Sequence, residues 1–242
     1  MNSSIQIISL SHLAISIIPV GVVIYILYHW SLDYKYPLYA ILRMLVQLLL
    51  IGYFLVYIFD ATCAWPILLV LMIMVLTSSW IALGTIKQKR KILYLKTLVS
   101  LCIGGGFVLI LITQGVLEIT PWYLPRYMIP LAGMIFANSM NSISLAAERL
   151  ISELEQNKSY ENARQIALKA SLIPMTNSLF AVGLVSLPGM MTGQILSGIS
   201  PFVAARYQIM VMCMIYGASG IAAACFLVLV RKDIDLHNHQ NN

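Results

Sequence analysis

A short run near residue 188 carries the residue types best suited to chemistry inside an apolar segment. Proline removes a backbone N–H donor and clashes with the carbonyl group four residues earlier, so we expect a helix to kink or break there, inside the membrane. Backbone groups freed by such a break line cavities in membrane transporters and can bind substrate. The run therefore predicts a pathway beside a helix break, formed by Pro188, Gly189, Met190, Met191, Thr192, Gly193 and Gln194.

Two interpretations of the sulfur atoms in this run stay open. Met190 and Met191, with Gln194 nearby, offer soft and neutral ligands to a metal ion. The chain has thirteen methionines in all, however, and methionine also serves as a flexible packing residue in apolar surroundings. Gly189 and Gly193 form a G-x-x-x-G pattern, which is typical of closely packed helices.

Polar residues also recur inside an apolar run nearer the middle of the chain. Asn138, Asn141, Leu145 and Glu148 follow one another at steps of three or four residues, which places them on one face of a helix. Polar groups are costly in a bilayer, so this face is predicted either to line a pathway or to hydrogen-bond a neighbouring helix.

A third polar group lies near the start of the chain. Arg43 and Gln47 are one helical turn apart in an otherwise apolar run. An ion pair between Arg43 and Glu148 is one hypothesis, and the alternative is that the arginine extends to the lipid headgroups.

The elements that must position these residues are membrane-spanning helices. The 242 residues are 60% hydrophobic and only 10% charged, a balance outside the range of soluble domains. The apolar residues come in blocks of about twenty, the length that crosses some 30 Å of hydrocarbon. We therefore predict an all-α integral membrane protein, one transmembrane domain over residues 1–242, with about seven spans at Ile5–His29, Leu38–Phe59, Thr62–Leu83, Thr97–Leu117, Tyr127–Ala147, Met175–Leu196 and Phe202–Val230.

The basic residues predict the orientation of these spans. Twelve of the fifteen Lys and Arg residues fall in connections on one side, whereas Arg126 and Arg206 fall on the other and Arg43 lies within the second span. Because basic residues collect on the cytoplasmic side, the N-terminus is predicted outside and the C-terminus in the cytoplasm. The basic residues are scattered between apolar blocks, so the expected surrounding is membrane lipid and not nucleic acid.

The cytoplasmic connection at about residues 149–174 is the longest polar stretch. An amphipathic helix is predicted from Ser159 to Ala170, with Pro174 closing it. The sequence has no phosphate-binding G-x-x-x-x-G-K-[ST] and no H-E-x-x-H, and no nucleophile, base and acid converge within its apolar runs. The chain is therefore not expected to be an enzyme.

The residues together resemble one family of membrane proteins. The similarity is to the FetB-like iron-export permeases. It is carried by the stretch from Leu184 to Leu196, the run from Tyr207 to Ile209, the segment from Pro130 to Met134 with that from Asn138 to Asn141, and Arg43 with Gln47 and Leu48. That family includes the plant aluminium-sensitivity membrane proteins. The resemblance spans nearly the whole chain, and its P-G-M-M-T-G-Q core is far more distinctive than a lone G-x-x-x-G.

The resemblance implies a permease subunit of an ATP-binding-cassette exporter in a bacterial-type inner membrane, concerned with iron or other metals. A separate cytosolic ATPase would use the ATP, and this chain would bind no cofactor of its own. A second copy of the chain would complete a two-fold transporter. Family members usually carry a longer ATPase-contacting segment, and here the helix with Glu161, Arg164 and Lys169 is the expected remainder of it. The alternative function is a non-transporting scaffold or regulator.

Overall fold

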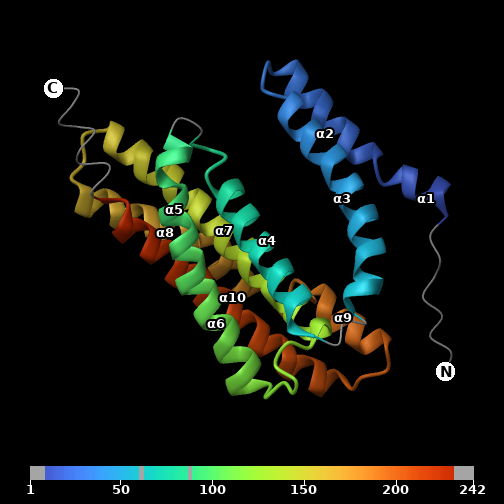
Figure 1. Ribbon diagram of the computed structural model, residues 1–242. Coiled ribbons are helices and arrows are strands. Elements are labelled where there is room, and N and C mark those ends of the chain that lie inside the picture. The colour runs from blue at the N-terminus through green and yellow to red at the C-terminus, as the bar shows by residue number, and fades with distance from the viewer. Residues whose placement is uncertain (1–8, 60–62, 87–88, 232–242) are drawn as a thin grey trace. The chain divides into compact units, whose positions relative to one another are not determined.

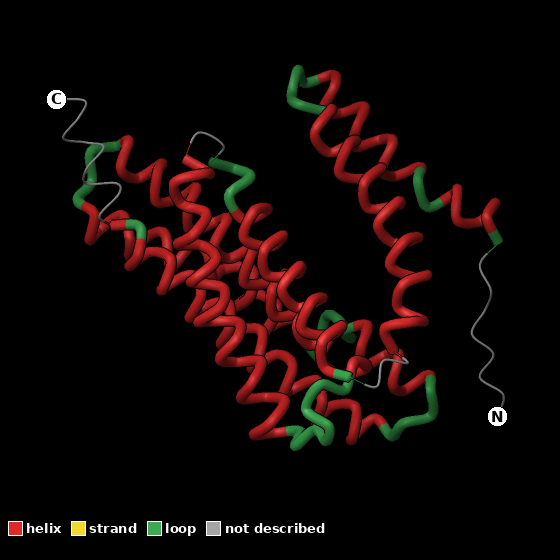
Figure 2. The backbone as a smooth tube through the Cα atoms, in the orientation of Figure 1, coloured by secondary structure: helices red, strands yellow, loops and turns green. Residues whose placement is uncertain are grey.

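Apolar segments in lipid must satisfy their backbone groups internally, and the protein does so with helices throughout its described part. A computed structural model describes residues 9–59, 63–86 and 89–231 (Figures 1 and 2). It divides into two compact units, Met1–Ala61 and Thr62–Asn242, called unit 1 and unit 2 below. The structure does not describe residues 1–8, 60–62, 87–88 and 232–242, so the predictions that fall on them lie outside the described part.

Unit 1 contains α1 (Leu10–Ile15), α2 (Ile18–His29) and α3 (Lys35–Phe59). Asp33 begins α3, because its carboxylate oxygen Oδ1 accepts the backbone N–H groups of Lys35 at 3.1 Å and Tyr36 at 3.2 Å. No described residue of α2 or α3 is buried within the unit, although both helices are almost wholly apolar. Such helices are stable in lipid and would not be in water.

Unit 2 is a helical bundle in which α7 (Pro125–Glu155) and α10 (Pro201–Leu229) are central. α7 contacts α4 (Ala64–Ala82), α8 (Tyr160–Ala181) and α10, and α10 also contacts α5 (Arg90–Leu101) and α9 (Gly189–Leu196). Figure 1 shows α7 in yellow-green running the length of this unit. The residues that follow α5 are η2 (Cys102–Gly106), α6 (Phe107–Ile110) and η3 (Leu111–Val116), of which η2 and η3 are π-helical.

Small side chains let the central helices approach one another closely. Lipid tails are as apolar as leucine, so helices in a bilayer associate through tight packing and not through burial of apolar area. The fully buried small residues of α7, α8 and α10 include Ala146, Ala163, Ala167, Ala218, Ala222 and Ala223. All of these alanines except Ala218 belong, together with Leu150 and Phe226, to the core where the three helices meet.

The glycines of η2 bring the backbone of this segment against two helices. A Cβ atom built on Gly104 would lie 2.5 Å from the backbone nitrogen of Ala222 in α10. One built on Gly105 would lie 2.9 Å from the Phe136 ring in α7, whereas one built on Gly106 would meet nothing within 4 Å. Only the first two glycines are therefore required for close packing.

The all-helical membrane architecture agrees with the prediction. Six helical stretches of the described residues are long and apolar enough to cross a bilayer: Ser11–His29, Lys35–Phe59, Ala64–Ala82, Arg90–Val116, Pro125–Glu155 and Pro201–Leu229. They correspond to six of the seven predicted spans. The span predicted at Met175–Leu196 is divided between the end of α8 and the whole of α9, with residues 182–188 between them in non-helical backbone.

The prediction that Pro174 closes the polar helix was wrong. Ser159 does begin α8, and its hydroxyl accepts the N–H of Asn162 at 3.5 Å, but the helix continues through Pro174 to Ala181. Proline costs the helix one backbone hydrogen bond, and packing of the rest of α8 against α7 and α10 offsets that cost. The polar connection and the next apolar segment are therefore parts of one helix.

Candidate functional site

The break between α8 and α9, residues 182–188, is a tight turn and not a kink. The backbone N–H groups of Leu184, Val185 and Ser186 all lie within 3.2 Å of the carbonyl oxygen of Ala181, the last residue of α8. Gly183 has a φ of +85°, in the left-handed region that favours glycine. Pro188 is the N-cap of α9, a position that needs no intrahelical N–H donor. The helix therefore ends seven residues before the proline, and the proline begins the next one.

Gly183 offers a direct test of the turn. Gly183→Ala is expected to cost about 1–2 kcal/mol, because alanine disfavours positive φ although nothing lies within 4 Å of the added Cβ. Gly189→Ala is the control, because Gly189 is helical and its Cβ position is equally open. Thermal unfolding of the detergent-solubilised protein measures both, and an equal response would contradict a strained turn at Gly183.

A cavity of about 320 Å³ lies beside the break, between α8, α9 and α10. The end of α8 and the turn contribute Leu179, Val182 and Gly183, and α9 contributes Met191. α10 contributes the stripe Ala205, Gln208, Ile209, Met212 and Cys213. These α10 residues recur at steps of three and four and therefore share one helix face.

Gln208 is the unusual member of this lining. It is only 5% exposed, and its side-chain oxygen Oε1 is buried with no hydrogen-bond partner among the described residues. A buried amide oxygen without a partner is costly, and such groups in native proteins commonly serve a ligand or an ordered water. The cavity thus combines an unpaired oxygen with the sulfur atoms of Met191, Met212 and Cys213.

Only one residue of the predicted Pro188–Gln194 run lines the cavity, namely Met191. Thr192 instead donates its hydroxyl to the carbonyl oxygen of Pro188 at 3.2 Å. Gln194 has a buried Oε1 without a described partner, but it lies outside the cavity lining. Gly189 and Gly193 have open space at Cβ, so their G-x-x-x-G makes no close contact among the described residues.

The polar residues of α7 lie on two different faces. Ser139 and Ser142 are buried against the bundle, whereas Asn141 and Glu148 are exposed and Asn138 is half-buried. The side-chain amide of Asn138 donates to the carbonyl oxygen of Met134 in its own helix at 2.8 Å. The predicted stripe is therefore on the face that unit 2 leaves open, and its role in a pathway stays a prediction.

Arg43 and Gln47 are exposed on α3 of unit 1. Glu148 belongs to unit 2. Each unit is described by itself, so the ion pair between Arg43 and Glu148 also stays a prediction.

The turn from α7 to α8 contains a buried carboxylate. The side chain of Glu153 is inaccessible to solvent and pairs with two cations, Arg149 at 2.5 Å and Lys158. The turn is closed by the backbone of Lys158, whose N–H reaches the carbonyl oxygen of Glu153 at 3.3 Å, and by Asn157 with a φ of 58°. Glu153 therefore stabilises the turn that joins α7 to α8.

The beginning of α8 is tied to the end of α10. The Tyr160 hydroxyl, which is buried, donates to the carbonyl oxygen of Leu227. Arg231 pairs with Glu161 at 2.8 Å and lies over the Tyr160 ring at 5.6 Å. Of the predicted coupling residues, Glu161 and Lys169 are exposed and Arg164 is half-buried. We call the group Glu153, Lys158, Tyr160, Glu161 and Arg231 the charged corner.

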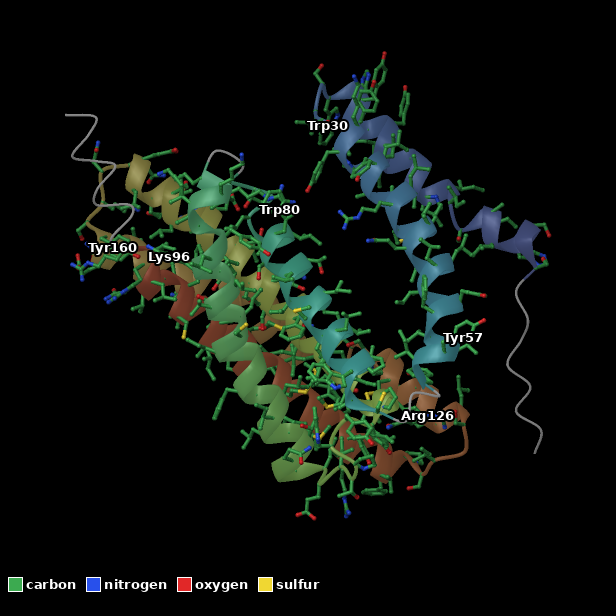
Figure 3. The ribbon with its side chains drawn as sticks, viewed as in Figure 1. Trp30, Tyr57, Trp80, Lys96, Arg126 and Tyr160 are labelled. Carbon is green, nitrogen blue, oxygen red and sulfur yellow. The ribbon has the colours of Figure 1, made fainter. Side chains whose placement is uncertain are left out.

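The charged corner and the break cavity occupy opposite ends of the same helix pair. α8 starts beside Leu227 and ends beside the lining residues of α10 near its N-terminus, so the two helices are antiparallel. From Leu227 to Gln208, α10 rises about 28 Å at 1.5 Å per residue, close to the thickness of a bilayer core. Figure 3 shows Tyr160 at one end of unit 2 and Arg126 at the other.

These features define a multi-pass α-helical membrane protein in which a helix ends early and leaves a cavity against the last span. The chain belongs to the family described as Uncharacterised protein family (UPF0014), whose model matches residues 10–234. The resemblance drawn from the sequence is therefore confirmed, because this family includes a relative named as an iron-export permease.

Three curated relatives illustrate the range of the family. The UPF0014 membrane protein slr1647 of Synechocystis is 40% identical over 72% of this chain and 73% of its own. The probable iron export permease protein FetB of Escherichia coli K12 is 34% identical over 78% of each chain. The protein ALUMINUM SENSITIVE 3 of Arabidopsis thaliana is 31% identical over 84% of this chain and 80% of its own. No solved structure matches the chain.

Proposed function

We propose that this chain is the transmembrane permease subunit of an ATP-binding-cassette exporter that handles metal ions. The observation that carries the proposal is the break cavity, because a span that ends early and leaves a recess with an unpaired buried oxygen suits a substrate site. The relative named as a probable iron export permease supports the same class of function.

The charged corner, together with Arg164 and Lys169 farther along α8, is the proposed docking surface for the ATPase. In this arrangement the Tyr160 end of unit 2 faces the cytoplasm of a bacterial-type cell, consistent with the basic connections on that side. Glu161, Arg164 and Lys169 on the first turns of α8 are the residues offered to the partner. A second copy of the chain completes the transporter, and the partner alone binds and hydrolyses ATP.

The antiparallel pair of α8 and α10 supplies the mechanical link. A displacement of the corner is carried along α8, because Tyr160 and Arg231 hold its beginning to the end of α10. α8 ends at the turn formed by residues 182–188. A relative movement of α9 and α10 beside this turn changes the shape of the cavity. ATP-driven closure of the partner thus alters access to a site about a membrane thickness away.

Co-expression with the candidate ATPase tests the proposal. The two proteins should co-purify in detergent, and cells that express both should hold less metal than cells that carry a partner without its catalytic Walker-motif lysine. The competing function is a scaffold or regulator. A chain that purifies without an ATPase and leaves cellular metal content unchanged would favour that alternative and contradict the proposal.

Tyr160→Phe tests whether the corner transmits the movement. Leu227 is among the last carbonyl groups of α10, which lack an intrahelical donor, and Tyr160 supplies one, so its loss leaves a buried acceptor unpaired at a cost of about 1–3 kcal/mol. We expect weaker stimulation of ATP hydrolysis by the permease and slower export. Tyr127→Phe is the control, because Tyr127 is exposed near the other end of α7. Equal activity of the Tyr160→Phe and Tyr127→Phe variants would argue against a role for the Tyr160–Leu227 hydrogen bond in transmitting the movement.

A further inference from the structure

The break cavity has an unusual set of donor atoms for its size. Three of its lining residues carry sulfur, namely Met191, Met212 and Cys213, and a fourth, Gln208, has a buried oxygen with no described partner. Its described lining includes no His, Asp or Glu. Among the described residues there is also no cluster of three His, Cys, Asp or Glu that could hold a metal ion. The available donors are therefore three soft sulfur atoms and one neutral amide oxygen, and only the thiol carries an ionisable proton.

The donor set indicates which cations the cavity accepts. Thioether sulfur selects soft ions such as Cu(I), whereas Fe²⁺ and Mg²⁺ draw on imidazole or carboxylate ligands that this lining lacks. Zn²⁺ also binds thiolate, but its sites take three or four ligands from Cys, His, Asp and Glu, and Cys213 is the one such residue in the described lining. We propose that the break cavity binds a soft monovalent metal cation, Cu⁺ or its analogue Ag⁺, through the sulfur atoms of Met191, Met212 and Cys213 together with Oε1 of Gln208. This inference rests on the proposed function, because it names the cargo of the same site.

Charge balance supports a monovalent ion. A net charge in apolar surroundings carries a large desolvation cost, and the other lining residues are apolar. A cation of charge +1 bound to one Cys213 thiolate and two neutral thioethers is neutral overall. A divalent ion with the same ligands keeps a charge of +1, which the described lining residues do not compensate.

The binding step is a proton exchange without electron transfer. The S–H bond of Cys213 breaks, its sulfur forms a bond to the metal, and the proton passes to water or buffer. The metal stays in its monovalent state throughout, so no oxidant or reductant takes part. Met191 and Met212 donate lone pairs and release nothing. One proton is therefore released for each ion bound.

Calorimetry with Ag⁺ tests the site without copper redox chemistry. The full chain, purified in detergent, carries Cys63, Cys102 and Cys225 changed to alanine, so that Cys213 is the sole cysteine. It is titrated with Ag⁺ in chloride-free nitrate solution, in two buffers with different protonation enthalpies. We expect about one Ag⁺ bound and one proton released per chain, and neither in the Cys213→Ala variant.

Neighbouring methionines provide matched controls. Met191→Leu and Met212→Leu should each weaken Ag⁺ binding by about tenfold or more, because each removes a ligand. Met190→Leu and Met210→Leu make the same near-isosteric change in α9 and α10, outside the described cavity lining, and should leave affinity unchanged. Gln208→Leu should weaken binding, and Gln165→Leu, at an exposed position, should not.

The outcomes separate this inference from the proposed function. Equal effects of lining and control methionines, absence of stoichiometric binding, or displacement of Ag⁺ by equimolar Fe²⁺ would overturn the soft-cation site. Failure to co-purify with an ATPase would instead overturn the exporter proposal and leave the binding result standing. Ag⁺ binding that is weakened by substitution of the predicted ligands, and not by the control substitutions, supports the site whatever the result of the ATPase experiment.

Discussion

Gly104→Ala is expected to destabilise the folded protein by about 2–3 kcal/mol, the upper part of the range for overpacking. The added Cβ would lie 2.5 Å from the backbone nitrogen and 2.8 Å from the Cα of Ala222. Backbone atoms in a packed helix cannot move aside as a flexible side chain does, so η2 and α10 would have to separate. Their contact is part of the core of unit 2, and its loss should lower the thermal unfolding temperature in detergent.

The adjacent glycines make this prediction a graded series. Gly105→Ala should cost less, because its Cβ meets the side chains of Phe136 and Ile135, which can shift. Gly106→Ala should be neutral or stabilise by up to about 1 kcal/mol, because nothing lies within 4 Å and alanine favours helix. Equal unfolding temperatures for the three variants would contradict close approach of η2 to α10.

Glu153→Ala is expected to produce the largest loss of function at the charged corner. Removal of the buried carboxylate leaves Arg149 and Lys158 without their shared partner and releases the turn that sets the start of α8. Coupling between distant sites is commonly worth 5–150-fold, so we expect about a tenfold or greater fall in permease-stimulated ATP hydrolysis. Export should fall with it, because the corner is the proposed contact with the ATPase.

Glu155→Ala is the matched control for this experiment. Glu155 is an exposed carboxylate two residues away at the end of the same helix, so it removes the same charge without disturbing the turn. Both variants should insert in the membrane and bind Ag⁺ with unchanged affinity, because the cavity lies at the other end of unit 2. If Glu155→Ala reduced ATP hydrolysis as much as Glu153→Ala, net charge and not the geometry of the turn would be responsible.

The location of the helices was largely predictable from the sequence. A span is set by its own length and composition, because about twenty apolar residues must cross the hydrocarbon wherever their neighbours lie. Ser159 at the start of α8 was likewise visible, since a cap depends only on residues within one turn. The prediction that Pro174 ends the helix was wrong because the effect of this proline depends on packing along the rest of α8. That packing cannot be predicted from the residues next to Pro174.

The cavity was less predictable, although a signal for it existed. Gln208 falls within the run from Tyr207 to Ile209 that supports the family resemblance, and with Met212 and Cys213 it recurs at helical spacing. Because the apolar helix α10 carries sulfur residues on several faces, its sequence alone does not indicate which face lines a cavity. The choice depends on where α8 ends, seven residues before the proline that marks the break in the sequence.

The sequence by itself determined that this protein is a multi-pass helical membrane protein of its family, and it marked the P-G-M-M-T-G-Q run as unusual. Only the tertiary structure decided that Met191 and Gln208 line one cavity, that Gly104 lies against Ala222, and that Tyr160 hydrogen-bonds Leu227. The physical reason is range: transfer into lipid and helix capping act on neighbouring residues, whereas a cavity or a close backbone contact requires segments brought together by packing.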